Sequence, residues 1–249
     1  MNIEFRNITF KYKEENIFTN FNLKIKENDL AYLIGLNNSG KSTIIKLLRN
    51  YPCIGDILFD GIELNQKNYK SISSCCSIID EENLNSISLD DLKKCFGYND
   101  EDYNKLDIKS PQTFMDIIKL NIYYSLINNK YKFIVIDDLI DYLNSRDKMV
   151  IYELIKKRHK QFKKTILVCS NNAYGMIYFK RILVLDKGII KFDGTLKKIS
   201  EIERVFDELG IYMPFIVDLS IKLKLYNLID KIYTDNVKLV NDIWKEKKK

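Results

Sequence analysis

Residues 35–43, Gly-Leu-Asn-Asn-Ser-Gly-Lys-Ser-Thr, have the types and spacing that suit the binding of phosphate. They fit the pattern G-x-x-x-x-G-K-[ST], in which glycines let the backbone approach phosphate oxygens and successive N–H groups form an anion-binding nest. Lys41 is expected to reach the β- and γ-phosphates of a nucleotide, and the Ser42 hydroxyl to bind Mg²⁺. The sequence therefore predicts a nucleotide site that comprises Gly35, Asn37, Asn38, Ser39, Gly40, Lys41, Ser42 and Thr43.

The segments on both sides of this loop favour phosphate binding over a chance Gly-Lys-Ser turn. Residues 30–34, Leu-Ala-Tyr-Leu-Ile, form an apolar run that is typical of a buried strand. Residues 44–48 continue with the apolar period of a helix. A helix that begins near Lys41 would direct the positive end of its dipole at the phosphates.

Two aspartates end another apolar run, Phe-Ile-Val-Ile at residues 133–136. A continuous run of this kind is typical of a central parallel strand covered on both faces. We expect Asp137 to hold Mg²⁺ together with Ser42, and Asp138 to be the base that activates the attacking water. The alternative is that both aspartates simply end a strand.

The order of apolar patterns along the chain predicts an α/β fold around a mainly parallel sheet. Helical patterns cover residues 147–162 and the chain from residue 196 onward, and residues 80–128 resemble a helical insertion. Lys187 and Gly188 are expected to form the turn of a hairpin. Strand patterns occupy residues 2–10, 20–26, 55–61, 74–79, 131–138, 165–169, 182–185 and 189–192.

Composition places the chain among globular proteins of the cytoplasm. The 249 residues are 46% hydrophobic and 30% charged, and no apolar run approaches the ~20 residues that span a bilayer. The net charge of +6 is spread along the chain, so no nucleic-acid partner is expected. The basic run at residues 245–249 is interpreted as a solvated end, with phospholipid or nucleic-acid contact as the alternative. The five cysteines are expected to be reduced.

The order of these parts resembles the ATP-binding subunit of ABC transporters over residues 2–200. An aromatic residue, Tyr12, precedes the phosphate-binding loop, and the hairpin at residues 187–195 is similar to the Lys-Gly hairpin of that family. Residues 209–219, Leu-Gly-Ile-Tyr-Met-Pro-Phe-Ile-Val-Asp-Leu, are similar to the segment after the ATPase domain of energy-coupling factor (ECF) ATPases.

This resemblance implies the P-loop NTPase fold of ABC ATPases. It would comprise an N-terminal antiparallel β subdomain, the helical insertion at about residues 80–128 and a C-terminal helical extension. The nucleotide-binding domain would span residues 1–204, and residues 205–249 would be the extension and a candidate dimerisation region. Tyr12 would stack on the adenine of ATP, although core packing or a turn also accounts for a tyrosine there.

The resemblance further implies an ECF-type importer that uses ATP to take up a vitamin or a transition-metal ion. The partners would be a second ABC ATPase subunit, in a homodimer or heterodimer, a membrane scaffold and a substrate-binding membrane subunit. The chain would lie peripherally on the cytoplasmic side of the membrane. The alternative is a non-transport regulator that binds nucleotide and hydrolyses it poorly. A P-loop kinase would not explain the hairpin or the tail.

Several positions depart from the family pattern. The glutamine that should follow residues 78–79 is replaced by Asp80, or by Glu81 in another alignment. The Leu-Ser-Gly-Gly-Gln signature corresponds to residues 109–113, Lys-Ser-Pro-Gln-Thr, which lack both glycines.

The two catalytic positions also depart from the pattern. The catalytic glutamate is replaced by Asp138, whose carboxylate lies ~1.5 Å further back. A misplacement of about an ångström costs on the order of 10²-fold in rate. The switch histidine is replaced by Asn171, which cannot carry a positive charge, while the single histidine, His159, is expected to be solvated. We therefore predict a site that binds ATP and hydrolyses it weakly.

Overall fold

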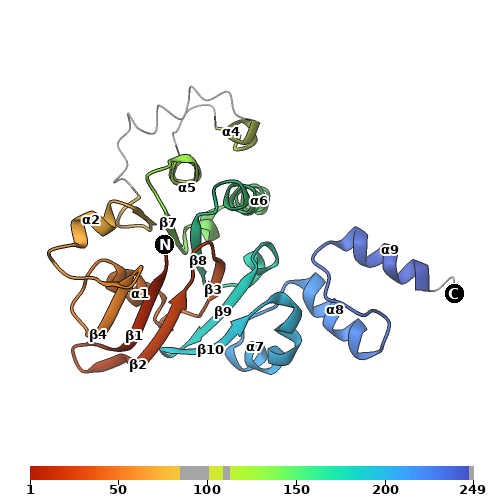
Figure 1. Cartoon of the computed structure of the whole chain (residues 1–249). Helices are drawn as coiled ribbons and strands as arrows, with labels where there is room; N and C mark the ends of the chain where they lie inside the picture. Colours follow the sequence, from red (N-terminus) through yellow and green to blue (C-terminus); the bar gives the residue numbers. More distant parts are fainter. Residues whose placement is uncertain (85–100, 109–112, 247–249) are drawn as a thin grey trace.

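The computed structural model describes residues 1–84, 101–108 and 113–246. Two sheets lie side by side, and helices cover the outer face of the larger one (Figure 1). The smaller sheet is antiparallel, and its strands follow the order β2 (Glu15–Ile25), β1 (Ile3–Tyr12), β4 (Ile54–Phe59) and β5 (Ile62–Glu63). It forms the predicted N-terminal β subdomain.

The larger sheet has six strands, five of which run parallel. Only β10 runs antiparallel, because the turn at Lys187 and Gly188 pairs it with β9 as a hairpin. The strand order is β10 (Ile189–Gly194), β9 (Arg181–Asp186), β3 (Leu30–Ile34), β8 (Thr165–Ser170), β7 (Phe133–Asp137) and β6 (Cys76–Ile79).

Alternate residues of the central strands enter two separate cores. In β3, Tyr32 packs toward helices α5 (Phe114–Ile127) and α6 (Ser145–Phe162), whereas Leu33 packs toward the small sheet and α1 (Lys41–Leu48). Ile134 and Val135 of β7 divide in the same way. Because both faces are covered, these strands are apolar without interruption in sequence, as the predicted buried strands required.

Shorter elements connect or extend these layers. Along the chain they are α2 (Tyr69–Ser73), α4 (Glu101–Lys105), η1 (Leu139–Tyr142), η2 (Tyr174–Tyr178), η3 (Leu196–Ile202), α7 (Glu203–Leu209), α8 (Phe215–Leu225) and α9 (Asn236–Glu246). In the predicted insertion, α4 and α5 are described, and residues 85–100 and 109–112 lie outside the described part. The predicted boundary after residue 204 falls within α7, and the division of the chain into two domains stays a prediction.

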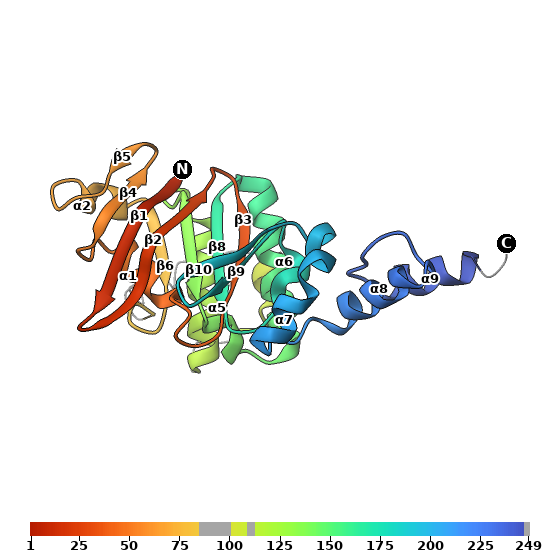
Figure 2. The same ribbon diagram turned by 90° about the horizontal axis from the view of Figure 1, so that it is seen from below.

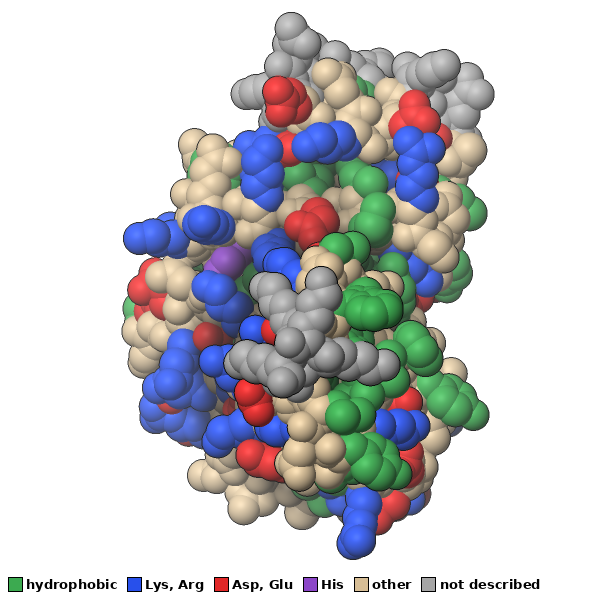
Figure 3. Space-filling view, turned by 90° about the vertical axis from the view of Figure 1, so that its right-hand side faces the viewer, with side chains coloured by type: hydrophobic (Ala, Val, Ile, Leu, Met, Phe, Trp, Pro, Cys, Tyr) green, Lys and Arg blue, Asp and Glu red, His purple; other side chains and the backbone are tan. Residues whose placement is uncertain are grey.

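Helices α8 and α9 project from the body of the molecule (Figure 2). The apolar residues of this C-terminal region divide between the inside and the outside, since Phe206 is buried and Phe215 is 75% exposed. Seen from the end that carries these helices, hydrophobic side chains gather along one side and lysines and arginines along the other (Figure 3). None of the helices in the described ranges has both the length and the apolar character that crossing a bilayer requires.

Candidate functional site

The loop between β3 and α1 lies at the carboxyl end of the parallel strands, and two of its glycines are required by its shape. Gly40 has φ +113°, a conformation that L-residues with side chains rarely adopt. A Cβ on Gly35 would lie 2.4 Å from Ser39 Oγ and 2.8 Å from the Leu185 carbonyl oxygen. No side chain caps the amino end of α1, which begins at Lys41, so its first N–H groups remain available to an anion.

The Lys41 ammonium is folded back onto this loop. It is 4% exposed and donates to the carbonyl oxygens of Gly35, at 2.6 Å, and Leu36, at 3.3 Å. It also lies 3.7 Å from Asp138 Oδ2. Lys41, which the motif singled out, is therefore held inside the loop, and the Asp138 carboxylate, which directly follows β7, lies beside it.

Ser42 and Asp137 meet although 95 positions separate them. The Ser42 hydroxyl donates to Asp137 Oδ2 at 3.4 Å. Within the described part of the chain, nothing donates to the buried Oδ1 atom of Asp137. Burial, and next the charge of Asp138, raise the pKa of Asp137 to about 6. A carboxylate with an open oxygen beside a serine hydroxyl fits the oxygen ligands that Mg²⁺ prefers.

Asp138 and Asn171 line the same cavity of about 530 Å³. Burial raises the pKa of Asp138, while the nearby Lys41 ammonium opposes that shift. Asp138 has φ 51°, a left-handed conformation that aspartate tolerates better than most residues. The cavity is acidic overall, and its charged lining residues are Lys46, Arg49, Asp80, Glu81, Glu82, Asp137, Asp138 and Asp141.

Tyr12 is the last residue of β1, which extends two residues beyond the strand predicted at residues 2–10. Its ring lines a separate cavity of about 640 Å³, whose other walls include Asn37, Asn38 and Thr43 of the loop. The Lys46 ammonium lies 4.7 Å from the centroid of the Tyr12 ring. One face of the predicted adenine platform is thus covered by a cation.

Ser39 belongs to the predicted set but is buried beneath the loop. Its side chain is 4% exposed, and its carbonyl oxygen accepts from the Gly188 N–H at 2.9 Å. Ser39 therefore fixes the loop to the β9–β10 hairpin, and it does not line either cavity.

The structure corrects the prediction for His159. The residue is 5% exposed, and its Nδ1 lies 2.9 Å from the Lys164 carbonyl oxygen. The last turn of α6 packs against the start of β8, which buries the ring inside an otherwise charged helical stretch. Of the residues that correspond to the signature, 109–113, residues 109–112 lie outside the described part of the chain, and Thr113 caps α5 by accepting from the Asp116 N–H at 3.1 Å.

Two residues near the site had no recognisable motif in the sequence. Asp141 accepts from Ser170 Oγ at 2.7 Å and Asn172 Nδ2 at 2.6 Å, which ties the segment after Asp138 to the end of β8. Arg49 pairs with Asp80 and with Glu82, the latter at 2.7 Å. Each contact joins residues about 30 positions apart, so local spacing carried no signal for it.

Comparisons with known proteins show which proteins this chain is similar to. Residues 18–137 match the ABC transporter family. An energy-coupling factor transporter ATP-binding protein of Mycoplasmopsis synoviae is 24% identical over 98% of this chain and its own full length. A protein of the same name in Ureaplasma parvum serovar 3 is 26% identical, over 98% of this chain and 91% of its own.

Solved structures show the same fold. A dimeric bacterial ABC transporter cassette superposes with a TM-score of 0.64 at 20% identity, over 78% of this chain and 98% of its own. A post-hydrolysis state of an ATP-binding cassette, bound to ADP and Pi, gives 0.62 at 19% identity over the same shares. The chain therefore resembles ABC transporter ATP-binding proteins over residues 18–137, has the fold of ABC ATPase cassettes, and is similar to energy-coupling factor ATP-binding proteins along nearly its whole length.

Proposed function

We propose that this chain binds ATP with Mg²⁺ at the loop of residues 35–43. The observation that carries the proposal is the convergence of Lys41, Ser42 and Asp137 at the carboxyl edge of the sheet. The Lys41 ammonium would leave the loop carbonyls for the β- and γ-phosphates, which compete for it as stronger, charged acceptors.

Ser42 and Asp137 would hold Mg²⁺, which neutralises charge on the phosphates when bound. The adenine would lie near Tyr12, in the cavity that this ring shares with the loop. Because the Lys46 ammonium covers one face of the ring, adenine stacks on the opposite face or displaces Lys46.

We propose that hydrolysis at this site is weak. Asp138 would orient the attacking water, but its shorter side chain holds the carboxylate back, and it lies 3.7 Å from the Lys41 ammonium. Asn171 can donate a hydrogen bond but cannot supply a positive charge as the phosphate charge redistributes. ATP binding would then be the principal event at this site.

The relatives' names support a place in an ECF-type transporter. The chain would be one of two ABC ATPase subunits, bound to a membrane scaffold and a substrate-binding membrane subunit on the cytoplasmic side. It would couple ATP binding to the uptake of a vitamin or a transition-metal ion. The non-transport regulator is less well supported, because the similarity to ECF proteins extends through the C-terminal helices.

The first test measures ATP binding and ATP turnover side by side on the purified chain. We expect micromolar binding that requires Mg²⁺, and turnover well below ~1 s⁻¹, the lower end of the usual enzyme range. Lys41→Ala should abolish binding. Lys222→Ala, which removes an exposed ammonium on α8, is the matched control and should bind normally.

Turnover at or above ~1 s⁻¹ would show that Asp138 and Asn171 suffice for hydrolysis. Binding that survives Lys41→Ala would refute the proposed site. Transport is tested by co-expression with membrane proteins encoded beside this chain: a subunit should be retained in the membrane fraction, whereas a regulator should stay soluble.

A further inference from the structure

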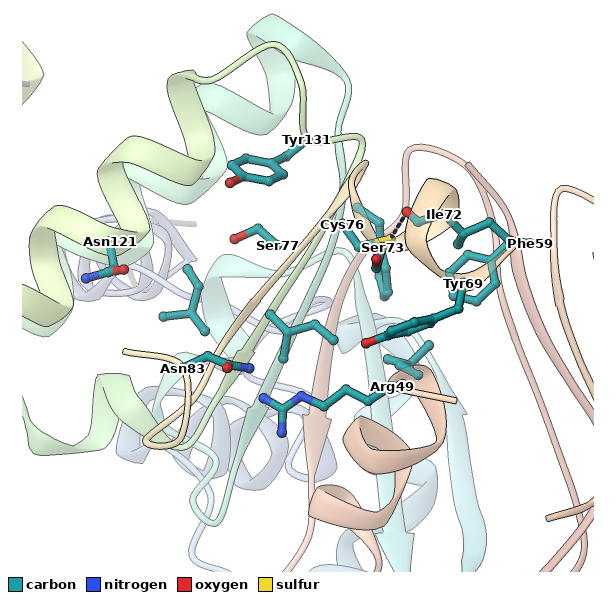
Figure 4. A pocket seen from close by; sticks show the side chains of 14 residues that line it. Arg49, Phe59, Tyr69, Ile72, Ser73, Cys76, Ser77, Asn83, Asn121 and Tyr131 are labelled. Atoms are coloured by element: carbon teal, nitrogen blue, oxygen red, sulfur yellow. Dashed lines mark hydrogen bonds between the residues drawn. The ribbon is translucent and has the colours of Figure 1, made fainter. Parts of the chain in front are cut away.

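Arg49 is the one described residue that lines both the acidic cavity beside the phosphate-binding loop and a second cavity of about 210 Å³. The second cavity lies between α2, β6 and α5, and Figure 4 shows Arg49 at its edge with Asn83 close by. The Arg49 side chain is only 14% exposed. Its guanidinium therefore forms part of the wall between the two cavities.

The guanidinium is bound by the segment that follows β6. Its Nη2 pairs with Asp80 Oδ2, and its Nη1 lies 2.7 Å from Glu82 Oε2. The Asn83 amide, turned so that its oxygen faces the guanidinium, also accepts from Arg49 Nε at 3.3 Å. Three of the four residues at 80–83 thus contact one side chain, and a fork of fixed N–H donors suits that task.

The fourth residue of this segment is held from another direction. Glu81 accepts a hydrogen bond from the Tyr142 hydroxyl, in η1 after Asp137 and Asp138. The Tyr142 ring in turn meets the ring of Phe114, the first residue of α5, at 5.6 Å. Residues 80–83 are therefore fixed between the phosphate-binding helix and the segment after β7.

Helix α1 joins these contacts to the loop. It begins at Lys41, whose ammonium fills the loop, and Arg49 caps its other end, ~12 Å away along the axis. Ile44 and Leu47 on the same helix are fully buried, so α1 is packed tightly into its core and would shift only as a rigid unit. A displacement at the Lys41 end is then transmitted to the guanidinium.

We propose that Arg49 is a positioning residue, through which occupancy of the phosphate-binding loop sets the position of residues 80–83 and of the wall of the second cavity. This inference rests on the proposed binding of ATP.

The experiment compares amide hydrogen exchange of the full chain with and without MgATP, in wild type and in Arg49→Met. In wild type, MgATP should slow exchange at residues 76–84 by on the order of tenfold. Arg49→Met should bind ATP within about threefold of wild type, because Arg49 does not reach the loop, but the slowing at residues 76–84 should vanish.

Arg49→Lys retains charge but lacks the fork, and should restore only part of the response. Asp80→Asn should act like Arg49→Met and covers the case in which that variant does not fold. Arg6→Met, which breaks an exposed Arg–Glu pair on β1, is the control and should respond as wild type does.

The outcomes separate the two proposals. A wild type that binds no ATP overturns the proposed function. A wild type that binds ATP without slowed exchange at residues 76–84 overturns the role of Arg49 alone. So does an Arg49→Met variant whose exchange still responds fully to MgATP.

Discussion

At the scale of single residues, burial of the Asp137 carboxylate destabilises the folded protein, and a role in holding Mg²⁺ would explain why an aspartate is placed there. Its pKa is raised from 3.8 to about 6, chiefly by burial and then by Asp138. The folded state therefore binds more protons than the unfolded state between these two pH values, and stability is lost as the pH rises through them. Above pH 6 the ionised carboxylate destabilises the nucleotide-free protein.

Asp137→Asn should therefore stabilise the nucleotide-free protein at pH 7.5, by about 1–3 kcal/mol. The gain should shrink below pH 6 and be absent near pH 4. Urea unfolding at several pH values measures this gain, with Asp107→Asn, an exposed change after α4, as the control. Equal gains at pH 4.5 and pH 7.5 would mean that charge burial is not the cause. The same variant should lose Mg²⁺-dependent ATP binding.

Asp138 and Asn171 yield a second prediction, in which activity is gained. Replacing them by the family's residues, in Asp138→Glu with Asn171→His, should raise ATP turnover on the order of 10²-fold if geometry and charge limit hydrolysis. Asp138 has φ 51°, so glutamate there should cost some stability, and the melting temperature must be measured alongside. Adding Lys41→Ala to the double variant should abolish its ATP turnover. If the double variant itself turns over ATP no faster than wild type, something other than Asp138 and Asn171 limits hydrolysis.

At the scale of elements, Lys164 holds the end of α5. Its ammonium is buried and donates to the carbonyl oxygens of Ser125, at 3.0 Å, and Asn128, at 2.5 Å. Such carbonyls lack partners within a helix and need donors from outside. Burial lowers the pKa of Lys164 from 10.5 to about 8. The unfolded state thus binds more protons between pH 8 and 10.5, and stability rises with pH across that window.

The stability difference between wild type and Lys164→Met isolates this contribution. Between pH 7.5 and pH 10, the free energy of unfolding of wild type should rise by about 1–2 kcal/mol relative to that of Lys164→Met, because only wild type has a buried ammonium that loses its proton in this range. Chemical unfolding at each pH provides the measurement. Lys160→Met, an exposed change on α6, should leave the difference flat. A flat profile for Lys164→Met would show that its ammonium remains hydrated.

Elements with a continuous apolar run or a local motif were predictable from sequence, and contacts between distant elements were not. Residues 30–34 and 133–137 read as buried strands because both of their faces enter a core. Ser42 and Asp137 followed from the rule that parallel strands meet at one edge. His159 and Arg49 were missed because packing of α6 on β8, and of α1 on residues 80–83, determines their surroundings. Tyr12 was misplaced because β1 continues through polar residues at its solvated end.

At the scale of the whole molecule, α9 has apolar residues on two faces. Leu239 is buried toward the body, whereas Val237 and Val240 are 68% and 48% exposed and share the opposite side with Trp244. Spacings of three and four residues place these side chains on one face of a helix. Phe215 and Leu225 of α8 are also exposed, and Figure 2 shows that α8 and α9 both lie at the projecting end of the molecule. Surfaces of this kind mark sites of association.

We predict that the exposed face of α9 joins two ATPase subunits, which would make residues 205–249 the dimerisation region that the sequence suggested as a candidate. Val237→Glu with Val240→Glu should convert dimers to monomers at about 50 µM, measured by light scattering after gel filtration, because two carboxylates would be buried unpaired at the contact. Lys238→Glu lies between them on α9 and changes the net charge by the same amount, so it controls for charge alone. Dimers that survive the valine changes, or that Lys238→Glu disrupts equally, would place the contact elsewhere. Loss of dimers with ATP binding intact would show that the helical end holds the subunits together independently of the nucleotide site.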